Sequence, residues 1–168
     1  DTAEDGATQT VPLIPGQPGQ FLVNASAFCF LNGWIDFNQD GDWSDTGERV
    51  ATDHPLAAGV NLFSLTVPAG AVIGENAYAR FRVAGAPGLG LTGSAPDGEV
   101  EDYRLDIVPA APVMQAPPPV TLGAENTLSW TPVTGAEAYA AQYAAAPSFS
   151  PPGAESGWLA GTSHTFTG

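Results

Sequence analysis

The stretch "YARFRVA" (residues 78–84) alternates apolar and charged side chains. Phe81 and Val83 fall on one face of such a segment, and Arg80 and Arg82 fall on the other. This period of two is that of a half-buried β-strand. The same alternation places further side chains inward: Phe63, Leu65 and Val67 in "NLFSLTV" (61–67), and Tyr103, Leu105 and Ile107 in "VEDYRLDI" (100–107). No window shows a sustained helical period, so the sequence predicts an all-β fold, an antiparallel β-sandwich.

The composition excludes some classes of function. The 168-residue chain has eighteen acidic side chains against four arginines and no lysine, which gives a formal net charge of −14. Because such a surface repels nucleic acid, we expect no nucleic-acid partner. No stretch approaches the ~20 apolar residues of a membrane span, so we expect no membrane insertion in this fragment. Divalent cations are compatible with the charge.

The single cysteine, Cys29, lies in the apolar run "AFCFLNGWI" and is predicted to be a small core residue. One cysteine permits no intrachain disulfide. An exported protein with this sequence would therefore need another source of rigidity, and bound calcium is a common one in calcium-rich extracellular media.

The character of the chain changes at "VPAAPVMQAPPPV" (108–120), a proline-rich stretch typical of a semi-rigid linker. The predicted division has three parts: a first β domain over residues 1–108, a linker over 109–119 and a second β domain over 120–168. Trp130 and Trp158 are predicted to be core tryptophans. Because the last part is shorter than the ~100 residues of a complete immunoglobulin-like sandwich, we expect it to be incomplete.

The acidic stretch "WIDFNQDGDWSDTGE" (34–48) predicts a calcium loop. Calcium takes six to eight oxygen ligands, which a short loop supplies when alternate side chains point inward and the chain turns sharply. Gly41 lies where that turn is needed. The predicted ligands are the side chains of Asp36, Asn38 and Asp40, the carboxylate or backbone carbonyl of Asp42, and Asp45 or Glu48 as the closing carboxylate. A solvated acidic turn is the alternative, because Asn, Asp and Gly are ordinary turn residues.

The loop departs from the helix-loop-helix calcium site in two ways. Its twelfth position is Gly47, with the glutamate one place later, and the preceding "GWIDF" is strand-like. We therefore expect a calcium loop in a β context. Magnesium is less expected, since it seldom uses a dedicated all-protein cage.

A second acidic cluster lies in "APDGEVEDYRLDI" (95–107). Its members are Asp97, Glu99, Glu101 and Asp102. They could form a second metal site or contribute to the first one. The competing interpretation, which we favour, pairs these carboxylates with Arg80, Arg82 and Arg104 on neighbouring strands.

The run "GEVEDY" (98–103), which follows "YARFRV" and "WIDFNQDGDWSDTGE", resembles the GEVED domain, a β-sandwich module of large secreted and surface-anchored bacterial proteins. The resemblance covers roughly residues 1–108. It implies a non-catalytic, extracellular and calcium-stabilised sandwich of the jelly-roll or immunoglobulin-like kind. It does not imply a particular ligand.

The remainder of the chain, with "NTLSWTPVTGAEAYAAQYAAAPSF" and its Trp130, is similar to the start of a fibronectin type III domain. It stops where the last two strands of that family should follow. We expect either that the sequence is a piece of a longer chain, the interpretation we favour, or that a neighbouring molecule supplies the missing strands.

Nothing in the sequence indicates catalysis. His54 and His164 have no context that suggests a triad, and one cysteine with two distant histidines makes zinc improbable. We expect a calcium-binding structural or adhesion module at the bacterial cell surface or outside the cell. Its expected partners are other protein modules, copies of itself or surface glycans. The alternatives are a strand-complemented filament or sheath subunit and a carbohydrate-binding module that uses Trp43.

Overall fold

The computed structural model describes residues 6–95, 97–116, 125–144 and 153–167. The chain divides into two compact units, Asp1–Val108 and Pro109–Gly168, which we call unit 1 and unit 2. In the described ranges the regular secondary structure is entirely β-strand, so the predicted all-β class is confirmed. No helix in these ranges is long and apolar enough to cross a membrane.

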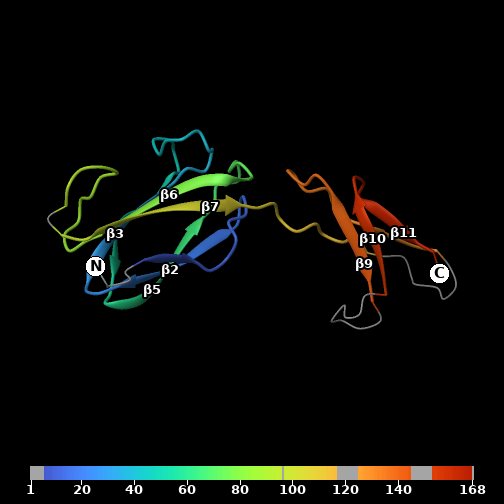
Figure 1. The fold of residues 1–168 in the computed structure, drawn as a ribbon, viewed down its shortest axis with the longest axis horizontal. Coiled ribbons are helices and arrows are strands. Elements are labelled where there is room, and N and C mark those ends of the chain that lie inside the picture. The colour runs from blue at the N-terminus through green and yellow to red at the C-terminus, as the bar shows by residue number, and fades with distance from the viewer. Residues whose placement is uncertain (1–5, 96, 117–124, 145–152, 168) are drawn as a thin grey trace. The chain divides into compact units, whose positions relative to one another are not determined.

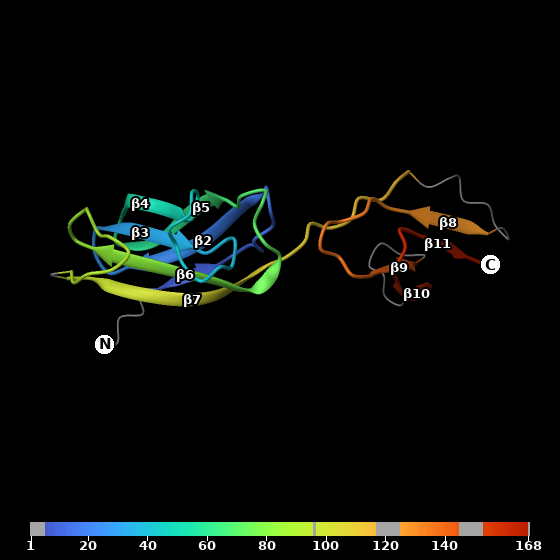
Figure 2. The same cartoon turned by 90° about the horizontal axis from the view of Figure 1, so that it is seen from above.

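Unit 1 is a sandwich of two antiparallel sheets (Figures 1 and 2). Its strands are β1 (Ala7–Gln9), β2 (Pro18–Ala25), β3 (Cys29–Ile35), β4 (Arg49–Leu56), β5 (Gly59–Thr66), β6 (Gly74–Ala84) and β7 (Glu99–Ile107). One sheet has the order β1-β2-β5 and the other the order β4-β3-β6-β7. Of the two predicted variants of the sandwich, this strand order is the immunoglobulin-like one.

The core of unit 1 lies between the two sheets, as the period-two patterns predict. Phe63, Phe81 and Ile107 are buried there. The other residues predicted to point inward are Val67 and Leu105, which are buried, and Leu65, Val83 and Tyr103, which are partly buried and pack against this core. Cys29, predicted as a core residue, is only half-buried and packs at the border of the core.

Arg82 points to the outer face of β6, as predicted, but it is buried, with 7% of its surface exposed. The glycine-rich segment 85–95 covers it. Its guanidinium donates hydrogen bonds to the carbonyl oxygens of Gly90 (2.6 Å) and Gly93 (2.7 Å). The segment is also tied at Gly88, whose N–H donates to Asp53 Oδ1 (2.7 Å). Arg49 and Arg80 donate longer bonds, of 3.4 Å, to the carbonyl oxygens of Leu89 and Leu91, so the buried Arg82 makes the shortest of the arginine contacts that organise this loop.

In its described ranges, 109–116, 125–144 and 153–167, unit 2 has two two-stranded antiparallel sheets. Its strands are β8 (Asn126–Ser129), β9 (Tyr139–Tyr143), β10 (Ala154–Leu159) and β11 (Ser163–Phe166), and the sheets pair β11 with β8 and β10 with β9. Residues 113–115 lie along the end of β8, where Met114 forms a bridge with Trp130. The last part of the predicted linker, 117–119, lies outside the described residues.

The two tryptophans of unit 2 have opposite environments. Trp130 is 4% exposed and forms the centre of a small core with Ala141 and Phe166, as predicted. Trp158 is 81% exposed, so its prediction as a core residue is wrong. The pairing of β10 with β9 shifts register between Glu155 and Trp158, and such a bulge changes the direction of side chains along a strand.

Candidate metal centre

The acidic loop is the connection between β3 and β4, residues 36–48. Its base is closed by a hydrogen bond from the Ile35 N–H to the Glu48 carbonyl oxygen (2.8 Å), which continues the ladder of the two strands. Gly41 has a φ of +94°, a conformation that side chains disfavour, so the sharp turn is where the sequence predicts it. The loop therefore returns on itself, and the predicted ligands come from both of its arms.

Two of the predicted ligands, Asp36 and Glu48, are buried at the base of the loop, with 1% and 3% of their surface exposed. Asp36 accepts hydrogen bonds from the N–H groups of Asp40 (3.3 Å) and Gly41 (3.0 Å). Glu48 Oε2 accepts one from the Asp45 N–H (3.2 Å), whereas Glu48 Oε1 is buried and has no hydrogen-bond partner among the described residues. A buried carboxylate oxygen without a partner is costly, and a cation would satisfy it.

Burial raises the pKa of Glu48 above its ordinary value of 4.5. The neighbouring charges of Asp36 and Asp45 act in the same direction, and the backbone N–H groups of Asp45 and, more weakly, Asn38 oppose them. The negative charge of Glu48 at the base of the loop is therefore energetically unfavourable.

Three further predicted ligands, Asp40, Asp42 and Asp45, lie together and are exposed. Each offers a carboxylate oxygen within 4.8 Å of the others, so the group could hold a metal ion. Asn38 bridges two of them, because its amide Nδ2 donates to Asp40 Oδ2 (3.1 Å) and to Asp45 Oδ2 (2.7 Å). Rotation of the amide by 180° would turn its oxygen toward the same position.

The Asp42 carboxylate has a second role in the loop. Its Oδ1 accepts hydrogen bonds from the Ser44 N–H and the Ser44 hydroxyl, both at 2.8 Å. The backbone bond, followed by the hydroxyl bond, lowers the pKa of Asp42 below its ordinary 3.8. Because this oxygen already caps a turn, the carbonyl alternative for Asp42 as a ligand stays open.

Trp43 lies half-buried against the sheet. Its indole N–H donates to the Tyr78 carbonyl oxygen (2.9 Å), and the Arg80 guanidinium lies 5.1 Å from the ring centroid. Sequence reasoning considered Trp43 only as an exposed sugar platform and missed these contacts. The available signal was the period of β6, which places Tyr78 and Arg80 on the outer face.

The second acidic cluster does not form a metal group among the described residues. Asp102 instead forms a bidentate ion pair with Arg80, with Oδ1 2.7 Å from Nε and Oδ2 2.6 Å from Nη2. Asp97 accepts a hydrogen bond from the Gly85 N–H (3.2 Å). The predicted pairing with arginines is therefore confirmed for Asp102. The predicted pairing of Arg82 is wrong, since its guanidinium binds loop carbonyls.

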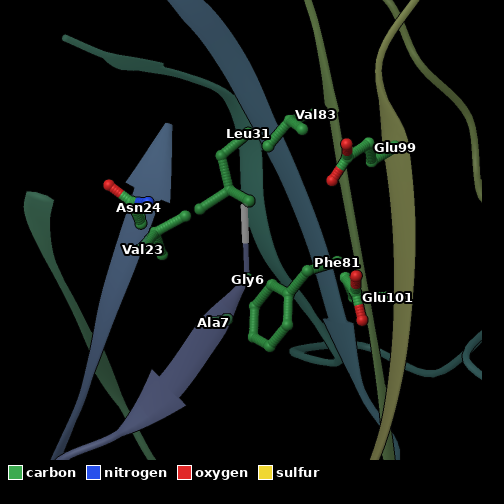
Figure 3. Close-up of a pocket in the computed structure, with 9 residues that line it drawn as sticks. All are labelled: Gly6, Ala7, Val23, Asn24, Leu31, Phe81, Val83, Glu99 and Glu101. Carbon is green, nitrogen blue, oxygen red and sulfur yellow. The ribbon is translucent and has the colours of Figure 1, made fainter. Parts of the chain in front are cut away.

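The remaining two members, Glu99 and Glu101, point to the inner face of β7, at the border of the core (Figure 3). They line a pocket of about 20 Å³ together with Val23, Leu31 and Phe81, room for a single water molecule. Beyond them on the same face is Tyr103, whose hydroxyl accepts a hydrogen bond from the Ala7 N–H (2.9 Å). The pocket is too small for a sugar.

Unit 2 carries an apolar groove of about 800 Å³. The large side chains that line it are Met114, Leu128, Trp130, Tyr139, Tyr143 and Trp158. Trp130 Nε1 is buried and meets no hydrogen-bond partner in the described part of the chain, while Trp158 and Met114 are exposed on the groove.

Comparison with known proteins identifies one family. Residues 30–106, which span β3 to β7 and include the acidic loop, match the family model of the GEVED domain, so this part of the predicted resemblance is confirmed. No curated protein and no solved structure matches the chain. The resemblance of unit 2 to a fibronectin type III domain stays a prediction.

Proposed function

We propose that unit 1 is a non-catalytic extracellular module that folds around a calcium ion bound by the loop 36–48. The observation that carries this proposal is the buried Glu48 Oε1, which accepts no hydrogen bond within the described part of the chain and lies at the base of a loop rich in carboxylates. Hydrogen bonds alone leave that oxygen unsatisfied. A divalent cation would pair with it and remove the repulsion that Asp36 and Asp45 exert on it.

The donor set suits calcium. Carboxylate, amide and carbonyl oxygens are hard ligands, and the loop contains neither histidine nor cysteine. We assign Asp36 and Glu48 as the buried ligands, and Asp40, Asp45 and the Asn38 amide oxygen as the ligands nearer to solvent. Asp42 completes the shell through its carbonyl or its free carboxylate oxygen.

The role of the ion is mechanical. Without it, the hydrogen bonds of the long connection between β3 and β4 would have to hold five carboxylates together against their mutual repulsion. With it, the connection becomes a rigid part of the sandwich. In an extracellular medium with millimolar calcium, a dissociation constant of about 10⁻⁴ M would keep such a module loaded.

The test is calorimetric unfolding of the full chain in calcium, in magnesium and in excess chelator. With a dissociation constant near ~10⁻⁴ M, 10 mM calcium should stabilise unit 1 by ~2.7 kcal/mol. Asp40→Asn should lose most of that gain, whereas Asp106→Asn, which removes an exposed carboxylate from β7, should retain it. Equal midpoints for the wild-type protein in all three media would refute calcium binding.

A second candidate function, docking of an extended protein segment, is favoured by the apolar groove of unit 2. An added strand would cover Trp158 and could offer a carbonyl oxygen to the buried Trp130 N–H. Sedimentation of the full chain over a hundredfold concentration range tests whether copies of the chain are the partner. Assembly that Trp158→Ser weakens would support it, and a monomer throughout would exclude self-assembly.

A further inference from the structure

One carbonyl oxygen on β6 holds two parts of the calcium loop. The Tyr78 carbonyl accepts the backbone N–H of Asp36 (2.8 Å) and the indole N–H of Trp43 (2.9 Å). Asp36 is the first predicted ligand, and Trp43 directly follows the predicted ligand Asp42. The indole bond therefore holds the exposed part of the loop that contains Trp43, which we call the outer arm, close to the buried Asp36 at the start of the loop.

Trp43 is in turn held from its ring face. The Arg80 guanidinium lies 5.1 Å from the ring centroid, within the range of a cation–π contact. Asp102 on the next strand fixes that guanidinium through two parallel hydrogen bonds of 2.7 and 2.6 Å. A bidentate pair sets the orientation of the guanidinium plane as well as its position. The chain of contacts thus runs from the GEVED run on β7 to the calcium loop.

We propose that Trp43, Arg80 and Asp102 form a clamp that preorganises the calcium loop and so sets its affinity for calcium. The proposal rests on the proposed function. It makes the three side chains positioning residues that need not touch the ion. The clamp acts before binding: it holds the outer arm in place against the repulsion of the carboxylates, so calcium does not have to order that arm.

The clamp predicts an effect opposite to that of simple electrostatics. Arg80 is a cation beside a cation site, so its charge alone repels calcium, and its removal should tighten binding. If Arg80 acts as a clamp, its removal should weaken binding, because Trp43 and the outer arm lose their support. The direction of the change in affinity therefore separates the two roles.

The experiment is calorimetric titration of the full chain with calcium, well below its unfolding temperature. Arg80→Gln and Asp102→Asn should each raise the dissociation constant about fivefold, the order of one exposed cation–π contact. The charge-matched controls are Arg104→Gln and Asp106→Asn, both on the outer face of β7. Arg104→Gln should bind as tightly as the wild-type protein or tighter, and Asp106→Asn should stay within about twofold.

The possible results are distinct. Failure of the wild-type protein to bind calcium would refute the proposed function. Normal binding by the wild-type protein with unchanged or tighter binding by Arg80→Gln would refute the clamp alone. A merely structural role would lower the stability of the calcium-free variant and leave its dissociation constant unchanged, which would also refute the clamp.

A third variant decides the matter if Arg80→Gln does not fold. Trp43→Phe keeps an aromatic face for Arg80 and replaces the indole by a smaller ring without the N–H that bonds to the Tyr78 carbonyl. It should raise the dissociation constant about threefold or more. Binding equal to that of the wild-type protein would show that the outer arm does not depend on this bond, and the clamp would be rejected.

Discussion

Glu48→Gln should have opposite effects on stability in the absence and in the presence of calcium. The glutamine keeps the size of the side chain and removes a buried charge, since 3% of the surface of Glu48 is exposed. In excess chelator, removal of a buried carboxylate with one unpartnered oxygen should stabilise unit 1 by about 1–2 kcal/mol. The unfolding midpoint should then rise by ~4–8 °C per kcal/mol.

The effect in chelator should depend on pH. The pKa of Glu48 is raised in the folded state, so the protonated carboxyl contributes to the stability of the fold. This contribution is complete below pH 4.5, the ordinary pKa, and is lost as the pH rises through the folded pKa. The wild-type protein should therefore lose stability relative to Glu48→Gln as the pH is raised from about 4.5 to 7. Below 4.5 the two proteins should become nearly equal, because both are then uncharged at this position.

In saturating calcium the order should reverse. Glu48→Gln removes a buried charged ligand, so we expect at least a hundredfold weaker dissociation constant and a calcium-induced gain in 10 mM calcium reduced by about 2.3 kcal/mol or more, which outweighs the advantage of the variant in chelator. The assay is urea unfolding of the full chain at four pH values, in chelator and in 10 mM calcium. Glu75→Gln, at an exposed position of β6, is the matched control. A variant that is less stable than the wild-type protein in chelator would refute the reasoning about the orphaned oxygen.

Three further predictions concern other parts of the chain. Gly98→Ala should destabilise unit 1 by more than ~2 kcal/mol in urea, because a Cβ at this residue (φ +93°) would lie 1.9 Å from the Val83 carbonyl oxygen; a smaller loss would contradict the close approach. Arg82→Gln should open the segment 85–95, and limited proteolysis with mass spectrometry should show faster cleavage there than in the wild-type protein. Trp158→Ser should change the stability of unit 2 by less than ~0.5 kcal/mol, as a calorimetric scan would show, since the side chain is 81% exposed.

The GEVED run shows which features of this site can be predicted from a sequence pattern and which cannot. Its alternation predicts correctly that Tyr103 points inward, and the same alternation places Glu99 and Glu101 on that inner face, away from the outward arginines predicted as their partners. The same alternation places Asp102 outside, within reach of an arginine on the neighbouring strand. Which arginine it meets follows from the register of β7 against β6, where Asp102 lies opposite Arg80. Register depends on the whole sheet, and local sequence does not state it.

The sequence by itself determined the all-β class, the strand faces and the composition of the acidic loop, because these depend on local periodicity and residue chemistry. It also located Gly41 at the turn. Only the tertiary structure decided which loop carboxylates are buried, that Glu48 Oε1 has no partner, and that Trp43 is held by Tyr78 and Arg80. The same holds for Arg82 beneath its loop and for Trp158 outside the core. The burial of a side chain and its hydrogen-bond partners are decided when segments that are distant in sequence pack together. A period of two therefore assigns a side chain to one face of a strand, but it does not predict which segment covers that face.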